Sequence, residues 1–399
     1  MRFLFLLCFL LGNQLLAQTS LTSDMLERYA FRFTIDDQNN LKDSVVQKQW
    51  NSWIGENQFV GIAEVHNSRQ LSLFTTALLP LLSEQDFECF ALELGPNTAA
   101  ILNRITSDPK KTTHKIRELN NQYGKKSRLK TPLIFVNKKA DALFMERASM
   151  LGFTFWGLDQ EYAFSYEMLI DEIYALEKKA SPEMLDLYND VKKLMRKKIF
   201  RKKAGGQPIY CWYQSNELLN NYFDHFKDNP KAMKIISDIR ESWDIYCKSA
   251  SGQGSNQQRA NYMKKNFESY YSSVGEQQPK VLLKLGGVHL THGISPFGVN
   301  DMGEFLHERS LASNAGFLSI RHLIPYRNGR SNIGKSGWKA VEMFLKLGQK
   351  DKWTAVDLRP FRKQLQERLI TANKAITYEL MNYDILLLSP DDQYGKPNY

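Results

Sequence analysis

The sequence contains short, continuously apolar runs rich in β-branched and aromatic residues, and segments of helix length separate them. Strands buried on both faces of a parallel sheet have this continuous apolar character, whereas half-exposed strands alternate apolar and polar positions. The pattern therefore predicts an α/β fold in which helices flank a largely parallel, buried sheet. The expected strands are Phe59–Val65, Phe87–Leu94, Phe153–Leu158, Val281–Val288, Phe317–Ile324, Thr354–Leu358 and Asp384–Leu388.

The stretch between the third and fourth expected strands lacks any strand pattern, and its apolar residues recur at helical spacing. Ser181 followed by Pro182 is typical of a helix start, with a capping hydroxyl and a proline in the first turn. We therefore expect a helical insertion at about residues 165–275, inside an α/β domain that spans residues 59–399. An N-terminal helical segment, residues 18–58, is expected to precede this domain.

The first 17 residues have the pattern of a signal peptide. Arg2 supplies a positive charge, an apolar stretch follows, and Ala17 precedes a plausible cleavage site before Gln18. The apolar stretch is far shorter than the ~20 residues that span a bilayer, which argues against an uncleaved anchor. No later segment approaches that length. The sequence thus predicts a secreted or periplasmic protein without a transmembrane segment once residues 1–17 are removed.

Composition and charge exclude several classes of protein. With 43% hydrophobic and 24% charged residues in 399, the chain is neither disordered nor a coiled coil. A formal net charge of +10 is modest for this length, so we expect no nucleic-acid partner. Residues 192–203 hold eight basic residues and no acidic one, and a looser basic cluster runs from Lys110 to Lys139. Such clusters are usually solvated helix faces, and the functional alternative is attraction of an anionic surface or substrate.

Three cysteines remain after residues 1–17, so they cannot all form pairs. Cys89 lies in an apolar strand and is expected to be a buried thiol. Cys211 and Cys247 lie in helical segments and could pair in an oxidising compartment.

Ionisable residues follow four of the expected strands at their carboxyl ends. Glu64 and His66 end the first strand, Glu93 the second, Asp159 the third and His289 the fourth. Because the carboxyl ends of parallel strands meet at one edge of a sheet, where ligands bind, we expect these side chains to converge on one cleft.

Taken singly, each of these residues has a structural explanation, since a lone strand-end carboxylate or imidazole is usually hydrogen-bonded within the fold. Asp159 alone would cap the following helix. As a set they suit two chemistries. In the first, Glu64 orients a histidine that deprotonates water, and the other histidine or Glu93 protonates the leaving group. In the second, the imidazoles and carboxylates hold a divalent metal that lowers the pKa of bound water. Neither needs a covalent nucleophile, and no G-x-S-x-G motif occurs.

These motifs resemble those of the superfamily that contains the erythromycin esterases, the ChaN-like haem-binding proteins and the Tiki/TraB proteins. The resemblance rests on AEVHN with Glu64 and His66, on ALELGP with Glu93, and on KLGGVHLTHG with His289. It spans roughly residues 59 to 390.

A further match lies in QRANYMKKNF, where Arg259, Met263 and Asn266 have the R-x-x-x-M-x-x-N spacing of the esterases. Residues at i, i+4 and i+7 share one helix face, so these side chains could point together at the cleft. The structural alternative is that Met263 packs in the core and Asn266 lies on a solvated face.

The resemblance implies a hydrolase of a small-molecule substrate. Its implied catalytic residues are Glu64, His66, Glu93 and His289, and its implied substrate-binding residues are Asp159, Arg259 and Asn266. The Glu-x-His-Asn spacing is nearer to the ChaN pattern than to the esterase pattern, so the alternative is a protein that binds haem or another porphyrin. The sequence leaves open whether a divalent metal, haem or no cofactor is bound, and which histidine is the base.

GRSNIGKS, from Gly329 to Ser336, matches the P-loop pattern G-x-x-x-x-G-K-[ST]. Its context is poor, because the match lies near the carboxyl terminus, Gly337 disturbs the next helix, and no later strand ends in a convincing Mg²⁺-binding aspartate. We therefore interpret the match as a basic loop between a strand and a helix.

Overall fold

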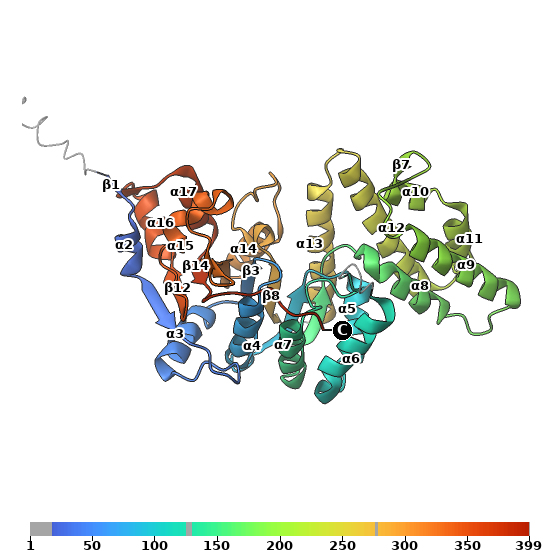
Figure 1. Ribbon diagram of the computed structural model, residues 1–399, viewed down its shortest axis with the longest axis horizontal. Helices are drawn as coiled ribbons and strands as arrows, with labels where there is room; N and C mark the ends of the chain where they lie inside the picture. Colours follow the sequence, from blue (N-terminus) through green and yellow to red (C-terminus); the bar gives the residue numbers. More distant parts are fainter. Residues whose placement is uncertain (1–17, 125–129, 276–277, 399) are drawn as a thin grey trace, which may run out of the picture.

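The computed structural model describes residues 18–124, 130–275 and 278–398 (Figure 1). The expected signal peptide, residues 1–17, lies outside the described residues. Within these residues, eight strands form one central sheet with the order β2-β12-β14-β9-β3-β8-β4-β5. Their bounds are β2 (Ala30–Phe33), β3 (Phe59–Glu64), β4 (Phe87–Leu92), β5 (Thr154–Gly157), β8 (Lys280–Gly286), β9 (Phe317–Leu323), β12 (Trp353–Asp357) and β14 (Ile385–Leu388).

The sheet is parallel from β14 to β5, and β12 and β2 complete it in the antiparallel sense. The predicted α/β class is confirmed, and each of the seven expected strands is present. The eighth strand, β2, comes from residues 18–58, for which we expected helices. That segment does hold α2 (Ser23–Glu27) and α3 (Ser44–Ile54), but its strand is only four residues long and contains Arg32. An edge strand of that length leaves little apolar signal in a sequence.

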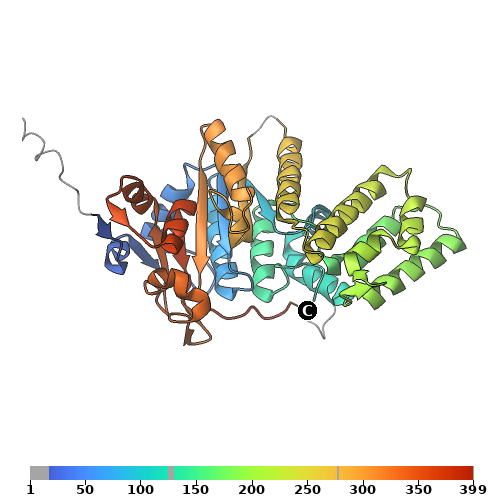
Figure 2. The same ribbon diagram turned by 90° about the horizontal axis from the view of Figure 1, so that it is seen from above.

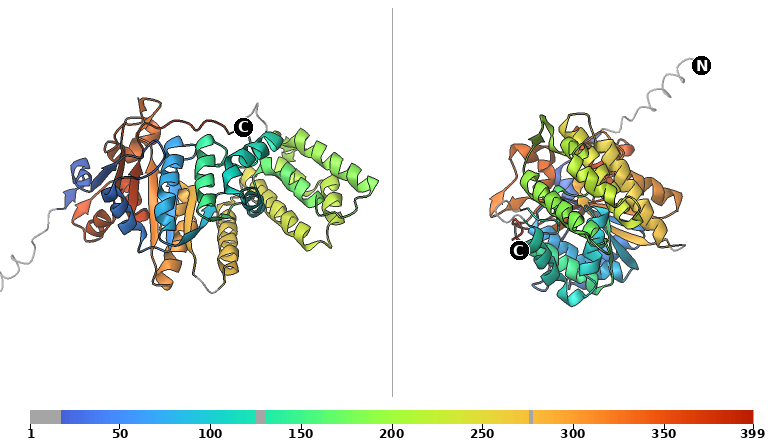
Figure 3. Two further views of the ribbon diagram at one scale, coloured as in Figure 1. Left: turned by 90° about the horizontal axis from the view of Figure 1, so that it is seen from below. Right: turned by 90° about the vertical axis from the view of Figure 1, so that its right-hand side faces the viewer.

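Helices cover both faces of the sheet (Figures 2 and 3). On one face α3, α4 (Arg69–Ser83) and α7 (Lys139–Met150) share a hydrophobic core with alternate strand residues such as Val60 and Ile62. On the other face α13 (Asn256–Ser273), α14 (Met302–Ala312) and α17 (Lys374–Asn382) pack against the intervening positions, such as Ala63. Burial on both faces explains why the strands are continuously apolar.

The expected helical insertion protrudes beyond the β5 end of the sheet (Figure 1). It consists of α8 (Tyr166–Tyr174), α9 (Pro182–Lys198), α10 (Ile209–Gln214), α11 (Glu217–His225) and α12 (Pro230–Ala250), and α13 then returns to the sheet. It has its own hydrophobic core. One small hairpin, β6 (Lys203–Ala204) with β7 (Gln207–Pro208), interrupts it.

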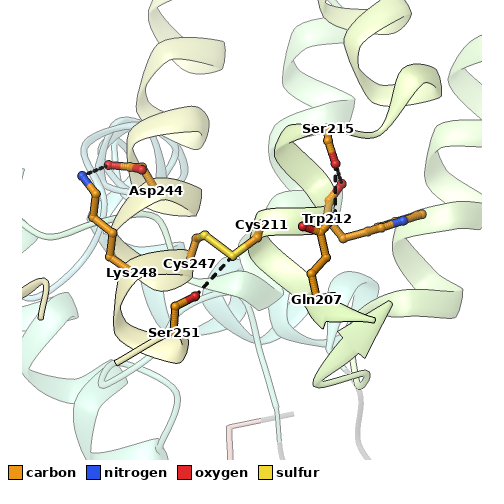
Figure 4. The surroundings of a disulfide bond; sticks show 8 residues. All are labelled: Gln207, Cys211, Trp212, Ser215, Asp244, Cys247, Lys248 and Ser251. Carbon is orange, nitrogen blue, oxygen red and sulfur yellow. Dashed lines mark hydrogen bonds and ion pairs between the residues drawn. A yellow bond between two sulfur atoms is a disulfide. The ribbon is translucent and has the colours of Figure 1, made fainter. Parts of the chain in front are cut away.

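A disulfide between Cys211 and Cys247 joins α10 to α12 in this insertion (Figure 4). Cys89 is a buried free thiol, as expected. Across the residues described, no helix combines the length and the apolar character needed to cross a membrane.

The P-loop match does not form a P-loop. Its first residues belong to a hairpin of β10 (Tyr326–Arg327) and β11 (Arg330–Ser331), and a 3₁₀ helix, η5 (Ser336–Val341), follows it. Lys335, the residue that would contact phosphates, donates a hydrogen bond to Asn332 Oδ1 at 2.8 Å. A phosphate cradle needs a buried strand that leads directly into an α-helix, so this geometry supports the interpretation as a surface loop.

Candidate active site

Three strands bring four ionisable side chains to the same edge of the sheet. Glu64 is the last residue of β3, and His66 follows it by two positions. Glu93 follows β4, and His289 lies in the 3₁₀ helix η4 (Gly287–Leu290) directly after β8. The Nε2 atoms of His66 and His289 lie 3.9 Å and 3.8 Å from the two carboxylate oxygens of Glu93. The four side chains therefore converge at this edge, as expected.

Glu64 is buried between an imidazole and an ammonium group. His66 Nδ1 lies 3.0 Å from Glu64 Oε1, and Lys284 of β8 donates to Glu64 Oε2. Burial opposes ionisation of Glu64, but the charge of Lys284 and the hydrogen bond with His66 lower the pKa of Glu64 to about 2. Because an ionised carboxylate only accepts hydrogen bonds, Nδ1 of His66 carries the proton and Nε2 is free to act as a base.

A second carboxylate–imidazole pair lies across the site. His289 Nδ1 donates to Oδ2 of Asp301 at 2.8 Å, and Asp301 also caps α14 by accepting from the Met302 amide. Burial lowers the pKa of both imidazoles. The hydrogen bonds that His66 donates to Glu64 and that His289 donates to Asp301 outweigh this, so both pKa values are raised above the ordinary histidine value.

Glu93 is fixed between the two histidines by donors on both of its oxygens. Arg259 of α13 donates to Oε1 at 2.9 Å, and the Gly286 amide donates to Oε2 at 2.6 Å. Arg259 also binds Asp159 through two hydrogen bonds of 2.8 Å and 2.6 Å. Burial opposes ionisation of Asp159, but Arg259 lowers its pKa. Asp159 therefore binds Arg259 at the site and does not act as a helix cap.

Three residues of α13 match the esterase spacing. Of these three, only Arg259 contacts the carboxylates of Glu93 and Asp159. Met263 is fully buried in the core beneath the sheet. Asn266 is buried, and its amide donates to the Leu158 carbonyl at 2.8 Å, where it holds the end of β5. We therefore do not propose substrate binding by Asn266.

The backbone at Gly286 approaches both His66 and Glu93 closely. A Cβ atom at Gly286 would lie 3.0 Å from His66 Nε2 and 3.1 Å from Glu93 Oε2. A side chain at this position would therefore crowd both reactive groups, whereas glycine leaves them in place.

Sequence reasoning missed three residues of the site. Lys284 was visible as a charged residue inside the apolar run VLLKLGG, and a lysine there requires a buried partner. Asp301 and Phe135 do not interrupt an apolar run, so no local sequence pattern points to them. The Phe135 ring stacks on the His66 imidazole with the ring centroids 3.9 Å apart and the planes 8° from parallel.

Neither a comparison with family models nor one with the curated proteins found a match. Solved structures share the fold. A mutant of the erythromycin esterase EreC in its open conformation has a TM-score of 0.54 and 14% identity, with 92% of this chain and 98% of that chain covered. A Bacillus cereus protein has a TM-score of 0.53 and 15% identity, with 94% and 98% covered. A succinoglycan biosynthesis protein has a TM-score of 0.55 and 13% identity, with 94% and 97% covered.

The predicted resemblance to the erythromycin esterases is thus confirmed at the level of the fold. A structure of ChaN from Campylobacter jejuni with haem gives a TM-score of 0.32 over 73% of this chain at 15% identity, which is too low to support an argument.

Proposed function

We propose that this protein, which shares the fold of the erythromycin esterases, is a hydrolase that activates water with His66. The observation that carries the proposal is the pair of carboxylate-bound imidazoles whose Nε2 atoms face Glu93 from two sides. One such imidazole can accept a proton while the other donates one, which is what hydrolysis without a covalent nucleophile requires.

His66 is the better candidate for the base because it is the more accessible imidazole. Its side chain is 35% exposed, whereas the side chain of His289 is 5% exposed. In the proposed reaction neutral His66 accepts the water proton at Nε2. Ionised Glu64 holds the tautomer and stabilises the imidazolium that forms. His289, whose pKa Asp301 raises, then donates from its protonated form to the leaving group, and Glu93 orients the species between the two imidazoles.

The same residues fit a divalent metal in their donor chemistry. Glu64, His66 and Glu93 each offer a ligand atom, and these atoms lie within 4.8 Å of one another. Such an ion, when bound, would lower the pKa of a bound water. We favour the direct acid–base route, because Lys284 already binds Glu64 and Arg259 already binds Glu93. Activity is therefore expected to survive dialysis against a chelator.

Haem binding would need an axial imidazole that faces an apolar slot. Here the free nitrogens of both imidazoles face a carboxylate, so we do not carry this alternative forward.

The substrate class that we propose is a small molecule with an ester or related bond. The disulfide between Cys211 and Cys247 supports an oxidising compartment, in agreement with the secreted or periplasmic location that the first 17 residues predict.

The test is to measure the turnover of a small panel of esters by the mature protein and by three variants. Circular dichroism first establishes that the variants are folded like the unaltered protein. General-base assistance is worth about 10²–10⁴-fold, so His66→Ala should lose that factor in kcat. Glu64→Gln should lower kcat more than it changes KM, because it keeps the shape and removes the charge. Lys335→Ala is the control and should be unaffected. Full activity in His66→Ala with loss in Lys335→Ala would replace the proposal with phosphate chemistry.

A further inference from the structure

The carboxyl-terminal segment, residues 390–398, lies extended across the molecule from the end of β14 to α6 (Thr112–Tyr123) (Figures 2 and 3). Both of its ends are anchored. Asp392 is fully buried, where it accepts from the Gln70 amide at 3.0 Å and from Arg327 at 3.0 Å. Asn398 is 1% exposed, and its amide donates to the Asn137 carbonyl at 3.0 Å.

Between these anchors the segment binds two loops in turn. The first directly follows His66, where Gln393 accepts from the Arg69 amide at 3.0 Å and Gly395 donates to the Asn67 carbonyl at 3.4 Å. The second directly follows Phe135, where Lys396 accepts from the Lys139 amide at 2.8 Å. The segment therefore joins the loop that follows His66 to the loop that follows Phe135, and the rings of these two residues stack on each other.

Phe135 has a backbone φ of 63°, a left-handed conformation that aromatic residues seldom adopt. Such a conformation costs of order 1–3 kcal/mol and persists only where the surroundings impose it. The bonds from the carboxyl-terminal segment to Asn137 and Lys139 are contacts that can impose it, because they lie two and four residues beyond Phe135.

We propose that Phe135 is a positioning residue for His66 and that the carboxyl-terminal segment holds it in place. The ring covers one face of the imidazole and restricts its rotation, so that Nδ1 stays on Glu64 and Nε2 stays near Glu93. This inference rests on the proposed role of His66 as the base, but the stack itself can be measured without any substrate.

Gly395 offers a sharp way to disturb the segment. A Cβ atom there would lie 2.7 Å and 2.8 Å from Cγ and Cβ of Lys138, atoms too near the backbone to move freely. Gly395→Ala should therefore push the segment off the Phe135 loop. Lys396→Ala is the matched control, because that side chain is exposed and the residue binds Lys139 through its backbone.

The first measurement is the proton chemical shift of the His66 ring, assigned by its loss in His66→Ala. Protons above an aromatic face are shielded, so Phe135→Ala should move the His66 signals downfield, and Phe135→Tyr should restore them. Gly395→Ala should shift them in the same direction, and Lys396→Ala should not. Unchanged signals in Phe135→Ala, or equal signals in Gly395→Ala and Lys396→Ala, would overturn the proposal. If Gly395→Ala does not fold, Asn120→Ala, which removes a bond to the Asn398 carbonyl, replaces it.

The second measurement is turnover. Misplacing a catalytic group by about 1 Å costs up to ~10²-fold, so Phe135→Ala and Gly395→Ala should lower kcat by about 10-fold or more with little change in KM. A rise in KM with an unchanged kcat would contradict a role in positioning the base. If no ester is hydrolysed by the unaltered protein, the proposed function fails, and the chemical shifts still decide whether the segment holds the stack.

Discussion

Lys284 and Glu64 form an ion pair in which each side chain is only 4% exposed, on the neighbouring strands β8 and β3. Charges are seldom buried unless a partner compensates them, and each of these two compensates the other. The pair keeps Glu64 ionised at any pH well above 2, so the partner of His66 is permanently anionic.

Lys284→Met should therefore be strongly destabilising. Removing one member of a buried ion pair typically costs ~3–5 kcal/mol, because the other charge is left without compensation. Chemical denaturation measures the free energy of unfolding. Lys280→Met, the same change at a partly exposed position of the same strand, is the control and should cost much less. The double variant Lys284→Met/Glu64→Gln should recover part of the loss. Equal stability of Lys284→Met and Lys280→Met would show that the pair does not stabilise the fold.

Gly286→Ala should impair turnover without unfolding the protein. The new methyl group would crowd His66 Nε2 at 3.0 Å and Glu93 Oε2 at 3.1 Å, so both groups must shift by a few tenths of an ångström. We expect kcat to fall by about 10-fold at an unchanged melting temperature. Gly337→Ala introduces the same methyl group where no atom lies within 4 Å, and it should behave as the unaltered protein. Full activity in Gly286→Ala would mean that Nε2 of His66 is not engaged in the reaction.

The seven expected strands were predictable because they are largely buried on both faces and are therefore continuously apolar. The parallel order of these strands also made much of the site predictable. Once the sheet is parallel, the ends of β3, β4 and β8 must meet, and the residues that follow them, Glu64, Glu93 and His289, must approach one another.

The rest of the site depends on loop paths that no local pattern encodes. Asp301 reaches His289 because the chain turns back to begin α14, and Phe135, four residues before α7, stacks on His66. Asn266 shows that helical spacing alone does not determine the partner of a side chain. The spacing places Asn266 on the same face as Arg259, but its side-chain amide donates to the backbone carbonyl of Leu158 at 2.8 Å.

Reduction of the Cys211–Cys247 disulfide should destabilise the helical insertion. The two cysteines are 36 residues apart, and closing a loop of that size removes enough entropy from the unfolded chain to stabilise the fold by about 4 kcal/mol in the chain-entropy model. Thermal unfolding followed by circular dichroism should show a lower melting temperature in a thiol reductant. The variant Cys211→Ser/Cys247→Ser should melt at the lower temperature in both conditions. A reductant effect that persists in this variant would assign the stabilisation elsewhere.

The pH dependence of kcat/KM should be bell-shaped, with both limbs above pH 6.5. His66 must be neutral to accept a proton, so activity appears as the pH rises through its pKa. His289 must be protonated to donate, so activity is lost as the pH rises through its own pKa. Both values are raised above 6.5 after the effect of burial is overcome, by Glu64 and by Asp301 respectively. A profile whose maximum lies below pH 6.5 would contradict this division of roles.

Asp301→Asn separates the two histidines in this profile. The Asp301 carboxylate raises the pKa of His289, so removing its charge should lower that pKa and move the alkaline limb to lower pH. The acidic limb should stay in place, because His66 donates its hydrogen bond to Glu64 and not to Asp301. Glu308→Gln, which removes a charge from an exposed position on the same helix, is the control for long-range electrostatics. If Asp301→Asn moved the acidic limb instead, His289 would be the base and His66 the acid.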